Sequence, residues 1–559
     1  MIVGLDVGGT HADVVLLGTA GVLKEVKVPT DPDDLFQTVL SALDQITTDV
    51  DPHRIERMVM STTLTTNAII QRKLPAVGMI VSGGPGIDPA LYRTNDHYVC
   101  ISGSIDHRGR EVEPIAADQV AAARDQFRAA GIRNVGVVTK FSTRNPDQEL
   151  AIARQLEGAF DKVFLGHRIS GNLSFPRRVV TTYLNAAVHP IHRQFFEAVQ
   201  KTLAQKGWDV PIRVLKADGG NTSFEASIDY PAQTIFSGPA ASVMGSIAFG
   251  PEDGEALVMD IGGTTTDMAV LIDQVPLLDP MGVELGGHKT LIRALKTHSI
   301  GIGGDSAVRF ADGRLQVGPH RDGPALAHGG PTPTPTDALV ILGKARRGDR
   351  ALAMDGFKPL AAAMGLAVED AAAEVFEHTC RLILDAADAM IARINQQPVY
   401  TVHEMLAGKK VAPTTILVLG GPAHLVAEKL EALSSRQVGV VPRWAVANAI
   451  GAALARTTCE VVLHADTERQ TAFAPEEDFQ QSVERSFDHR DALRMVLDLL
   501  KKKAIARGAN PDHLEMEVTE DLQFNMVRGF QTTGRNIRIR AQVKPGLIHD
   551  YDPVAGRLM

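Results

Sequence analysis

An eight-residue pattern, Asp-x-Gly-Gly-Thr-x-x-Asp, occurs twice in the chain, at Asp6–Asp13 and at Asp260–Asp267. Paired glycines let the backbone approach a ligand closely, so a Gly-Gly turn can present its N–H groups to phosphate oxygens. An aspartate beside such a turn would repel a bare phosphate, and the two are compatible only if a divalent cation lies between them. These residue types at this spacing therefore indicate chemistry on a phosphate that carries a metal ion.

Each copy of the pattern lies between two apolar runs, which the sequence predicts to be the strands of a hairpin. Residues 2–5 and 14–17 flank the first copy, and residues 256–259 and 268–271 flank the second. A single copy would be more typical of an ordinary hairpin with a tight turn. Two copies with identical spacing favour a nucleotide held between two facing hairpins, and the ligand that this arrangement predicts is ATP.

A third glycine site follows another apolar run. Residues 414–419 predict a buried strand, Gly420 and Gly421 a turn, and residues 424–433 a helix. A turn between a strand and a helix lets a flat base or a sugar lie against the backbone. This feature is common in α/β proteins, so it supports the nucleotide site only in combination with the two hairpins.

The alternation of strands and helices predicts an α/β fold with largely parallel sheets covered by helices. It runs from the N-terminus to about residue 180 and resumes beyond it, whereas the last hundred residues combine a charged helix with two short strands. We therefore expect three domains, at 1–180, 181–459 and 460–559, the last a small α+β domain. Two helices rich in small residues, within 236–247 and 444–453, should cross closely, either as a hinge between lobes or as ordinary tight packing.

The composition argues against several classes of function. The net charge of −9 and the aromatic content of 5% do not support a nucleic-acid partner. The 3 cysteines are far apart and form no Cys-x-x-Cys pair, which fits buried free thiols in a reducing compartment. No apolar run reaches the roughly 18 residues of a membrane span. We expect a soluble, cytoplasmic protein that does not bind a membrane.

Five further segments accompany the two hairpins: Ser61–Ala68, Asp218–Gly220, Ser237–Ala240, His298–Gly304 and Pro335–Ala338. In this order they resemble the hydantoinase/5-oxoprolinase family (hydantoin utilisation protein A-like), within the superfamily of actin-like ATPases that includes sugar kinases, actin and heat-shock ATPases. The resemblance covers most of residues 1–455. It implies two actin-like (ribonuclease H-like) lobes flanking a nucleotide cleft, and ATP-dependent hydrolysis of cyclic amides such as hydantoin or 5-oxoproline.

The chain departs from the family pattern at a few positions. His11 and Ala12 stand where Phe-Thr is usual, Asp305 interrupts a Gly-Gly-Gly-Ser run, and Leu339 stands where Asn is common. These departures leave the ATP assignment in place and leave the particular substrate open. The resemblance further implies a second, hydantoinase-type subunit as a partner, and we also expect a homo-oligomer.

The resemblance implies a role for each motif residue. Asp6 and Asp260 would hold Mg²⁺ through water, with Asp13 and Asp267 as further catalytic carboxylates or turn-stabilising residues. The phosphates would be bound by the N–H groups and hydroxyls of Gly8, Gly9, Thr10, Gly262, Gly263, Thr264 and Thr265, and the adenosine by Gly420 and Gly421. The candidates for substrate contact are Thr63, Asn67 and His298, although Asn67 could serve only to start a helix.

Other hypotheses stay open at this point. The chain could be a small-molecule kinase of the sugar-kinase type, an ATP-dependent carboxylase subunit, or a nucleotide-switched binding protein. His288, His298 and Asp305 lie within one stretch and could form a second metal or substrate site. Because the chain contains 18 histidines, chance clustering is the favoured interpretation of that stretch.

Overall fold

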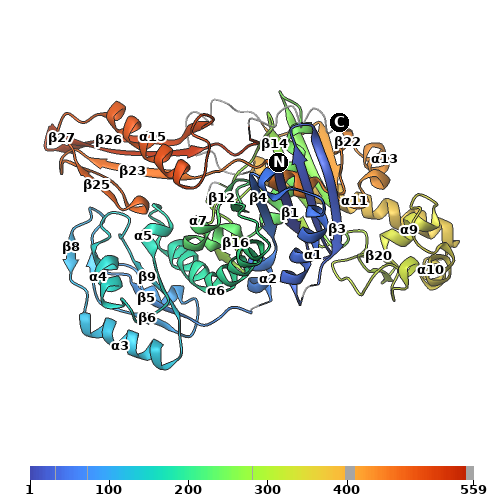
Figure 1. The fold of residues 1–559 in the computed structure, drawn as a ribbon, viewed down its shortest axis with the longest axis horizontal. Coiled ribbons are helices and arrows are strands. Elements are labelled where there is room, and N and C mark those ends of the chain that lie inside the picture. The colour runs from blue at the N-terminus through green and yellow to red at the C-terminus, as the bar shows by residue number, and fades with distance from the viewer. Residues whose placement is uncertain (32, 72, 280, 397–409, 549–559) are drawn as a thin grey trace.

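The computed structural model describes residues 1–548 except positions 32, 72, 280 and 397–409. It is a mixed α/β fold with two central sheets (Figure 1). A four-stranded sheet and the C-terminal five-stranded sheet lie at one end of the long axis, and the helices α9 and α10 lie at the other. Among the described residues no single helix has the length and apolar character of a membrane span, although the bent pair α10 and α11 passes on those two criteria alone.

The first central sheet contains the N-terminal hairpin. Its six strands are, in order, β12 (Asn221–Ser223), β11 (Ile212–Leu215), β4 (Arg57–Thr62), β1 (Ile2–Val7), β2 (His11–Gly18) and β3 (Gly21–Pro29). β1 pairs antiparallel with β2 and parallel with β4, which is itself parallel to β11. The helices of this region are α1 (Leu35–Thr47), α2 (Leu64–Ile70), α6 (Phe175–Gln205) and α7 (Phe224–Asp229).

The second central sheet repeats the plan of the first around the second hairpin. Its path is β15 (Val275–Pro276), β14 (Thr266–Ile272), β13 (Glu255–Ile261), β21 (Thr415–Leu419) and β22 (Gln437–Val440), and β18 (Thr297–Ile300) also pairs with β14. As in the first sheet, the hairpin strands are antiparallel and the next two strands are parallel to the first. A large apolar core joins this sheet to α9 (Pro335–Ile341), α10 (Arg350–Met364), α11 (Val368–Asn395) and α13 (Ala423–Leu433).

Two helices rich in small residues lie between the central sheets. α8 (Ser237–Ser246) packs its apolar side chains against β13, and α14 (Ala447–Leu454) packs against β1 and β2. A Cβ added at Gly451 of α14 would overlap the carbonyl oxygen of Ala241 in α8. The close crossing predicted for these helices is therefore confirmed, and it depends on glycine at the contact.

A separate parallel sheet branches from the first half of the chain. It consists of β10 (Lys162–Leu165), β9 (Asn134–Thr139), β5 (Val77–Ser82) and β6 (Tyr98–Cys100), with helices α3 (Ala117–Ala129), α4 (Asp147–Gln155) and α5 (Gly166–Ile169). Three small hairpins complete the described elements before the C-terminal region: β7–β8 (Ser104–Ile105, Glu111–Glu113), β16–β17 (Glu284–Leu285, His288–Lys289) and β19–β20 (Val308–Ala311, Arg314–Val317).

The C-terminal region forms one antiparallel sheet with a single long helix beside it. The strand order is β25 (Phe479–Ser482), β24 (Thr471–Ala474), β23 (Glu460–Asp466), β27 (Gln531–Val543) and β26 (Met516–Arg528), and the helix is α15 (His489–Ala506). The first strand of this sheet in chain order begins at Glu460. α6 spans the position between residues 180 and 181, and β11 and β12, which follow it, belong to the first central sheet.

Candidate active site

The two Asp-x-Gly-Gly-Thr-x-x-Asp segments form equivalent hairpins. In the first, Asp6 of β1 is paired in register with Asp13 of β2, and in the second Asp260 of β13 is paired with Asp267 of β14. Each hairpin therefore carries two paired carboxylates, one on each strand, on either side of its glycine turn. The sequence repeat is a structural repeat as well.

The turns leave some of their N–H groups available. The Gly8 N–H donates to the carbonyl of His11 (3.0 Å), and the Gly262 N–H donates to the carbonyl of Thr265 (2.9 Å). These two amides close the turns and are engaged within the chain. Within the described part of the chain no hydrogen bond uses the four N–H groups that follow them, those of Gly9, Thr10, Gly263 and Thr264.

The two hairpins converge on a single side chain. The Nδ2 atom of Asn448, in α14, lies 3.4 Å from Oδ2 of Asp6 and 3.4 Å from Oδ2 of Asp260. α14 holds this amide between the sheets because its apolar face is buried against β1 and β2. Asp6 and Asp260 are thus brought to one place from opposite halves of the sequence.

Burial governs the protonation of the carboxylates. It raises the pKa of Asp6 to about 7; Asp13 and Asp260 add to the rise, whereas hydrogen bonds from Ser61 and Asn448 oppose it. Burial also raises the pKa of Asp267 to about 7, and the charge of Asp260 contributes. Crowded, desolvated carboxylates of this kind favour the binding of a cation.

Two hydrogen bonds partly offset the free-energy cost of burying these carboxylates. Lys27 of β3 donates to Oδ1 of Asp13 at 2.7 Å, and Ser242 of α8 donates to Oδ2 of Asp260 at 2.6 Å. The pKa values of Asp13 and Asp260 are nevertheless raised by burial. Asp13 is bonded to a lysine of the neighbouring strand, so it does more than stabilise its own turn.

The residues around Asp6 and Asp260 are suited to a magnesium ion that is bound through its waters. Oδ1 of Asp6 is buried and has no hydrogen-bond partner, so an acceptor is left over beside Asp260. In the described ranges of the chain no group of three or more His, Cys, Asp and Glu side chains is arranged to bind a metal ion directly. Two carboxylates with a spare oxygen suit Mg²⁺, which usually keeps several of its waters.

The third glycine site adjoins the second hairpin. Gly420 has φ of +92°, and a Cβ there would lie 2.6 Å from Oδ1 of Asp260 and would overlap the backbone of Ile261. Only glycine fits this position. Beside it, His424 stacks on Trp444 with ring centroids 4.8 Å apart, which gives the turn an aromatic neighbour that the sequence did not reveal.

Two of the expected substrate residues, Thr63 and Asn67, lie together at α2, and the third, His298, lies on β18. Thr63 directly precedes α2, and its Oγ1 donates to the carbonyl of Val7 and accepts from Nδ2 of Asn67, both at 3.3 Å. Asn67 lies within α2 rather than at its start. His298 lies on β18 opposite Met268, while His288 is on the separate strand β17 and Asp305 follows β18.

The site contains three polar residues that sequence reasoning missed: Asn448, Ser242 and Lys27. Asn448 is a polar residue in a helix of alanines and glycine, and that contrast could have drawn attention to it. Ser242 occupies the same kind of position in α8. Lys27 gives no comparable signal, because it is one of several lysines on a strand with alternating exposure.

Taken together, two repeated sheets and their converging acidic hairpins define a mixed α/β protein with a paired-hairpin site. Family models agree: the hydantoinase/oxoprolinase model matches residues 178–461, and the model of the hydantoinase/oxoprolinase N-terminal region matches residues 2–160. The chain belongs to the hydantoinase/oxoprolinase family.

The individual proteins that the chain matches are only distantly similar to it in sequence. Caprolactamase subunit alpha of Pseudomonas jessenii is 25% identical over 415 residues, covering 66% of this chain and 60% of the relative. The acetophenone carboxylase gamma subunit of Aromatoleum aromaticum is 26% identical, covering 61% and 53%. The chain thus spans little more than half the length of these two curated relatives.

A solved structure shares the fold. The crystal structure of ATP-dependent caprolactamase from P. jessenii superimposes with a TM-score of 0.72 and 19% identity, covering 98% of this chain and 88% of that one. At this identity the similarity establishes the mixed α/β fold, including the C-terminal region that lies beyond the family models.

Proposed function

We propose that this chain is the ATP-using component of an enzyme that opens cyclic amides. It would act through two actin-like, ribonuclease H-like lobes built around the two central sheets. The observation that carries the proposal is the contact of Asn448 with both Asp6 and Asp260, because it places two equivalent phosphate-type hairpins at one site. The family membership and the caprolactamase relative supply the class of substrate.

In this proposal residues of both hairpins take part in binding Mg-ATP. Asp6 and Asp260 would hold Mg²⁺ through water, and the bound ion would neutralise phosphate charge. The free N–H groups at the two tips, with the hydroxyls of Thr10, Thr264 and Thr265, would hold phosphate oxygens, and Gly420 and Gly421 would lie against the adenosine. Phosphoryl transfer needs mainly such positioning and charge neutralisation.

The chemistry follows from the stability of the amide bond. Resonance makes an amide carbonyl a poor electrophile. Transfer of the γ-phosphoryl group to the amide oxygen removes that resonance and leaves ADP. Water then adds to the activated carbon, and the ring C–N bond breaks as the nitrogen takes up a proton, which leaves an acyl phosphate. A second water hydrolyses the acyl phosphate to the carboxylate and inorganic phosphate. Asp13 and Asp267, beside the metal-binding pair, are our candidates to orient a water or a cation.

We also propose that a second subunit takes part. The relatives that the chain matches are named as an alpha and a gamma subunit, which supports an assembly of more than one kind of chain. The carboxylase name of the second relative supports one alternative, ATP-dependent carboxylation of a ketone, on the same nucleotide site.

Parallel measurement of ADP and inorganic phosphate tests the proposal. With caprolactam, 5-oxoproline and hydantoin, with and without the partner subunit, we expect lactam-stimulated release of both products in equal amounts. ADP without phosphate would instead identify a kinase, and a requirement for bicarbonate and a ketone a carboxylase. An unstimulated rate with the whole panel, with and without partner, would refute the amide reaction. Asp260→Asn should abolish turnover. As a control, Asp253→Asn removes an exposed aspartate that precedes β13 and should leave turnover unchanged.

A further inference from the structure

A small cavity of about 50 Å³ lies apart from the two hairpins, and no hairpin residue lines it. Its walls come from five stretches: α5 and α6, the loop after β11, the segment after α7 with Tyr230 and Gln233, the loop before β18, and the C-terminal region from Cys459 to Arg507. The cavity is therefore closed by parts of the chain that are distant in sequence.

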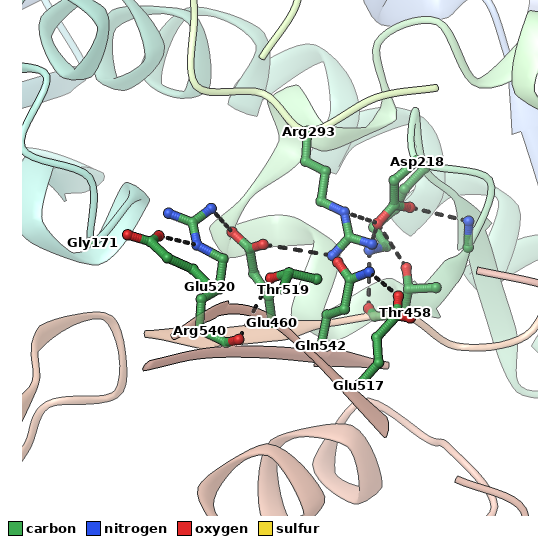
Figure 2. Close-up of polar contacts among 12 residues, drawn as sticks. Gly171, Asp218, Arg293, Thr458, Glu460, Glu517, Thr519, Glu520, Arg540 and Gln542 are labelled. Carbon is green, nitrogen blue, oxygen red and sulfur yellow. Dashed lines mark hydrogen bonds and ion pairs between the residues drawn. The ribbon is translucent and has the colours of Figure 1, made fainter. Parts of the chain in front are cut away.

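The side chain of Arg293 is the unusual feature of this cavity. Figure 2 shows it reaching between Asp218 and Glu460, and the closest nitrogen–oxygen distance to each carboxylate is 3.6 Å. All three of its guanidinium nitrogens are buried, and none has a hydrogen-bond partner. A guanidinium has five N–H donors, and buried donors are normally satisfied. Arg293 therefore lacks the acceptor that its position calls for.

The neighbouring carboxylates are already engaged by other donors. Asp218 accepts hydrogen bonds from Lys216 Nζ (3.1 Å), Thr458 Oγ1 (2.8 Å) and the Gly220 N–H (3.0 Å). Glu460 also faces Arg540 at 3.7 Å (Figure 2). Both carboxylates lie within ion-pair range of Arg293 but are too far away, at 3.6 Å, to accept a hydrogen bond, so its N–H donors remain free for an acceptor from outside the chain.

Positive charge predominates on the cavity wall. Five cationic side chains line it: Arg168, Lys216, Arg293, Lys503 and Arg507. Three carboxylates oppose them, those of Asp218, Glu460 and Glu476, and burial raises the pKa of Glu476. Arg168 is partly exposed and paired with Asp478, and Lys503 is paired with Glu477. The guanidinium of Arg293, whose buried nitrogens lack hydrogen-bond partners, is therefore the group that favours an anion here.

The volume limits what the anion can be. One water requires roughly 10–15 Å³ of such volume, so the cavity has room for about four waters or for one group of three or four non-hydrogen atoms. A lactam ring is too large. A guanidinium presents its donors in a planar fork that matches a planar oxyanion. We propose that this cavity binds a small planar oxyanion, a carboxylate or bicarbonate, through Arg293.

The binding can be measured without nucleotide, so the result is independent of the proposed reaction. Thermal unfolding of the full chain is followed at constant ionic strength in formate, bicarbonate or chloride. We expect formate and bicarbonate to raise the melting temperature above that in chloride, because a ligand of the native state stabilises it. A further titration with 5-oxoproline shows whether a carboxylate on a larger molecule also enters; the cavity volume predicts that it does not.

Variants of Arg293 complete the experiment. R293Q should weaken the apparent affinity for formate at least tenfold, and R293K, which keeps the charge without the fork, should be intermediate. The matched control is R309Q, which removes an exposed arginine paired with Asp322 and should behave like wild type. Equal melting temperatures in formate and chloride for the wild type would overturn the proposal, as would equal formate shifts in wild type and R293K.

Discussion

Replacement of Asp6 by asparagine should stabilise the ligand-free protein and abolish its ATPase activity. Asp6 is 4% exposed, and burial raises its pKa from the ordinary value of 3.8 to about 7. Between these two pH values the unfolded chain binds fewer protons at this residue than the folded chain does. Asp6 therefore makes the protein less stable as the pH rises from about 4 to 7, and the loss is complete above pH 7.

The size of the effect follows from the same values. At about 1.4 kcal/mol for each unit of pKa, a rise from 3.8 to about 7 corresponds to about 4 kcal/mol at pH 8. An asparagine keeps the shape and removes the charge, but its NH₂ group cannot accept the hydrogen bond that one carboxylate oxygen accepts, at a cost of about 1 kcal/mol. We expect Asp6→Asn to raise the free energy of unfolding by about 2–3 kcal/mol at pH 8, and by little at pH 4.

Urea unfolding at several pH values, in the absence of nucleotide and divalent cations, measures this difference. The control is Asp33→Asn, which removes an exposed aspartate from the same half of the chain. Mg-ATP should raise the melting temperature of the wild type and not that of the Asp6 variant. If the Asp6→Asn protein is no more stable than wild type at pH 8, the argument that burial of the charged Asp6 carboxylate destabilises the folded protein is refuted.

Three further variants probe the same region. Asn448→Ala removes the donor shared by Asp6 and Asp260, the proposed magnesium ligands, and should lower kcat or the affinity for Mg²⁺ by about 10- to 100-fold, as measured by ATPase rates over a range of Mg²⁺ concentrations. Lys27→Met leaves Asp13 without its cation and should cost about 1–2 kcal/mol at pH 8 and less at acidic pH, because burial raises the pKa of Asp13 and protonation removes its charge; equal losses by urea unfolding at pH 8 and at acidic pH would contradict this. Gly451→Ala should cost about 1–3 kcal/mol by forcing α8 and α14 apart, whereas Gly439→Ala, where a Cβ meets only an ordinary contact, should melt like wild type.

Local patterns in the sequence predicted the local structure of the site. The apolar runs and glycine pairs were enough to predict both hairpins, because a strand, a tight turn and a second strand are specified by neighbouring residues. Their convergence was inferred from the repetition, and the residue that joins them was missed. Asn448 reaches both aspartates because α14 packs between the two sheets. The spacing of apolar residues in a sequence does not reveal which element each face of a helix will contact.

The ends of the domains also show which features a sequence reveals and which it does not. The start of the C-terminal sheet at Glu460 follows a change in composition, which a sequence reveals. By contrast, α6 runs through position 180 without any such change. Along residues 536–541 of β27, buried and partly buried positions alternate. The polar face of this strand is only partly exposed, because Arg538 and Arg540 are engaged by Glu520 and by Glu460.

The position of Asn448 has a consequence for biosynthesis. The ribosome releases Asp6 first and Asp260 much later, and the helix that contacts both of them emerges only after most of the polypeptide has been made. A nascent chain or a fragment that ends before α14 carries both acidic hairpins and α8 but lacks the side chain that contacts both aspartates. The paired-hairpin site is therefore completed late, when the final part of the second sheet and α14 are added.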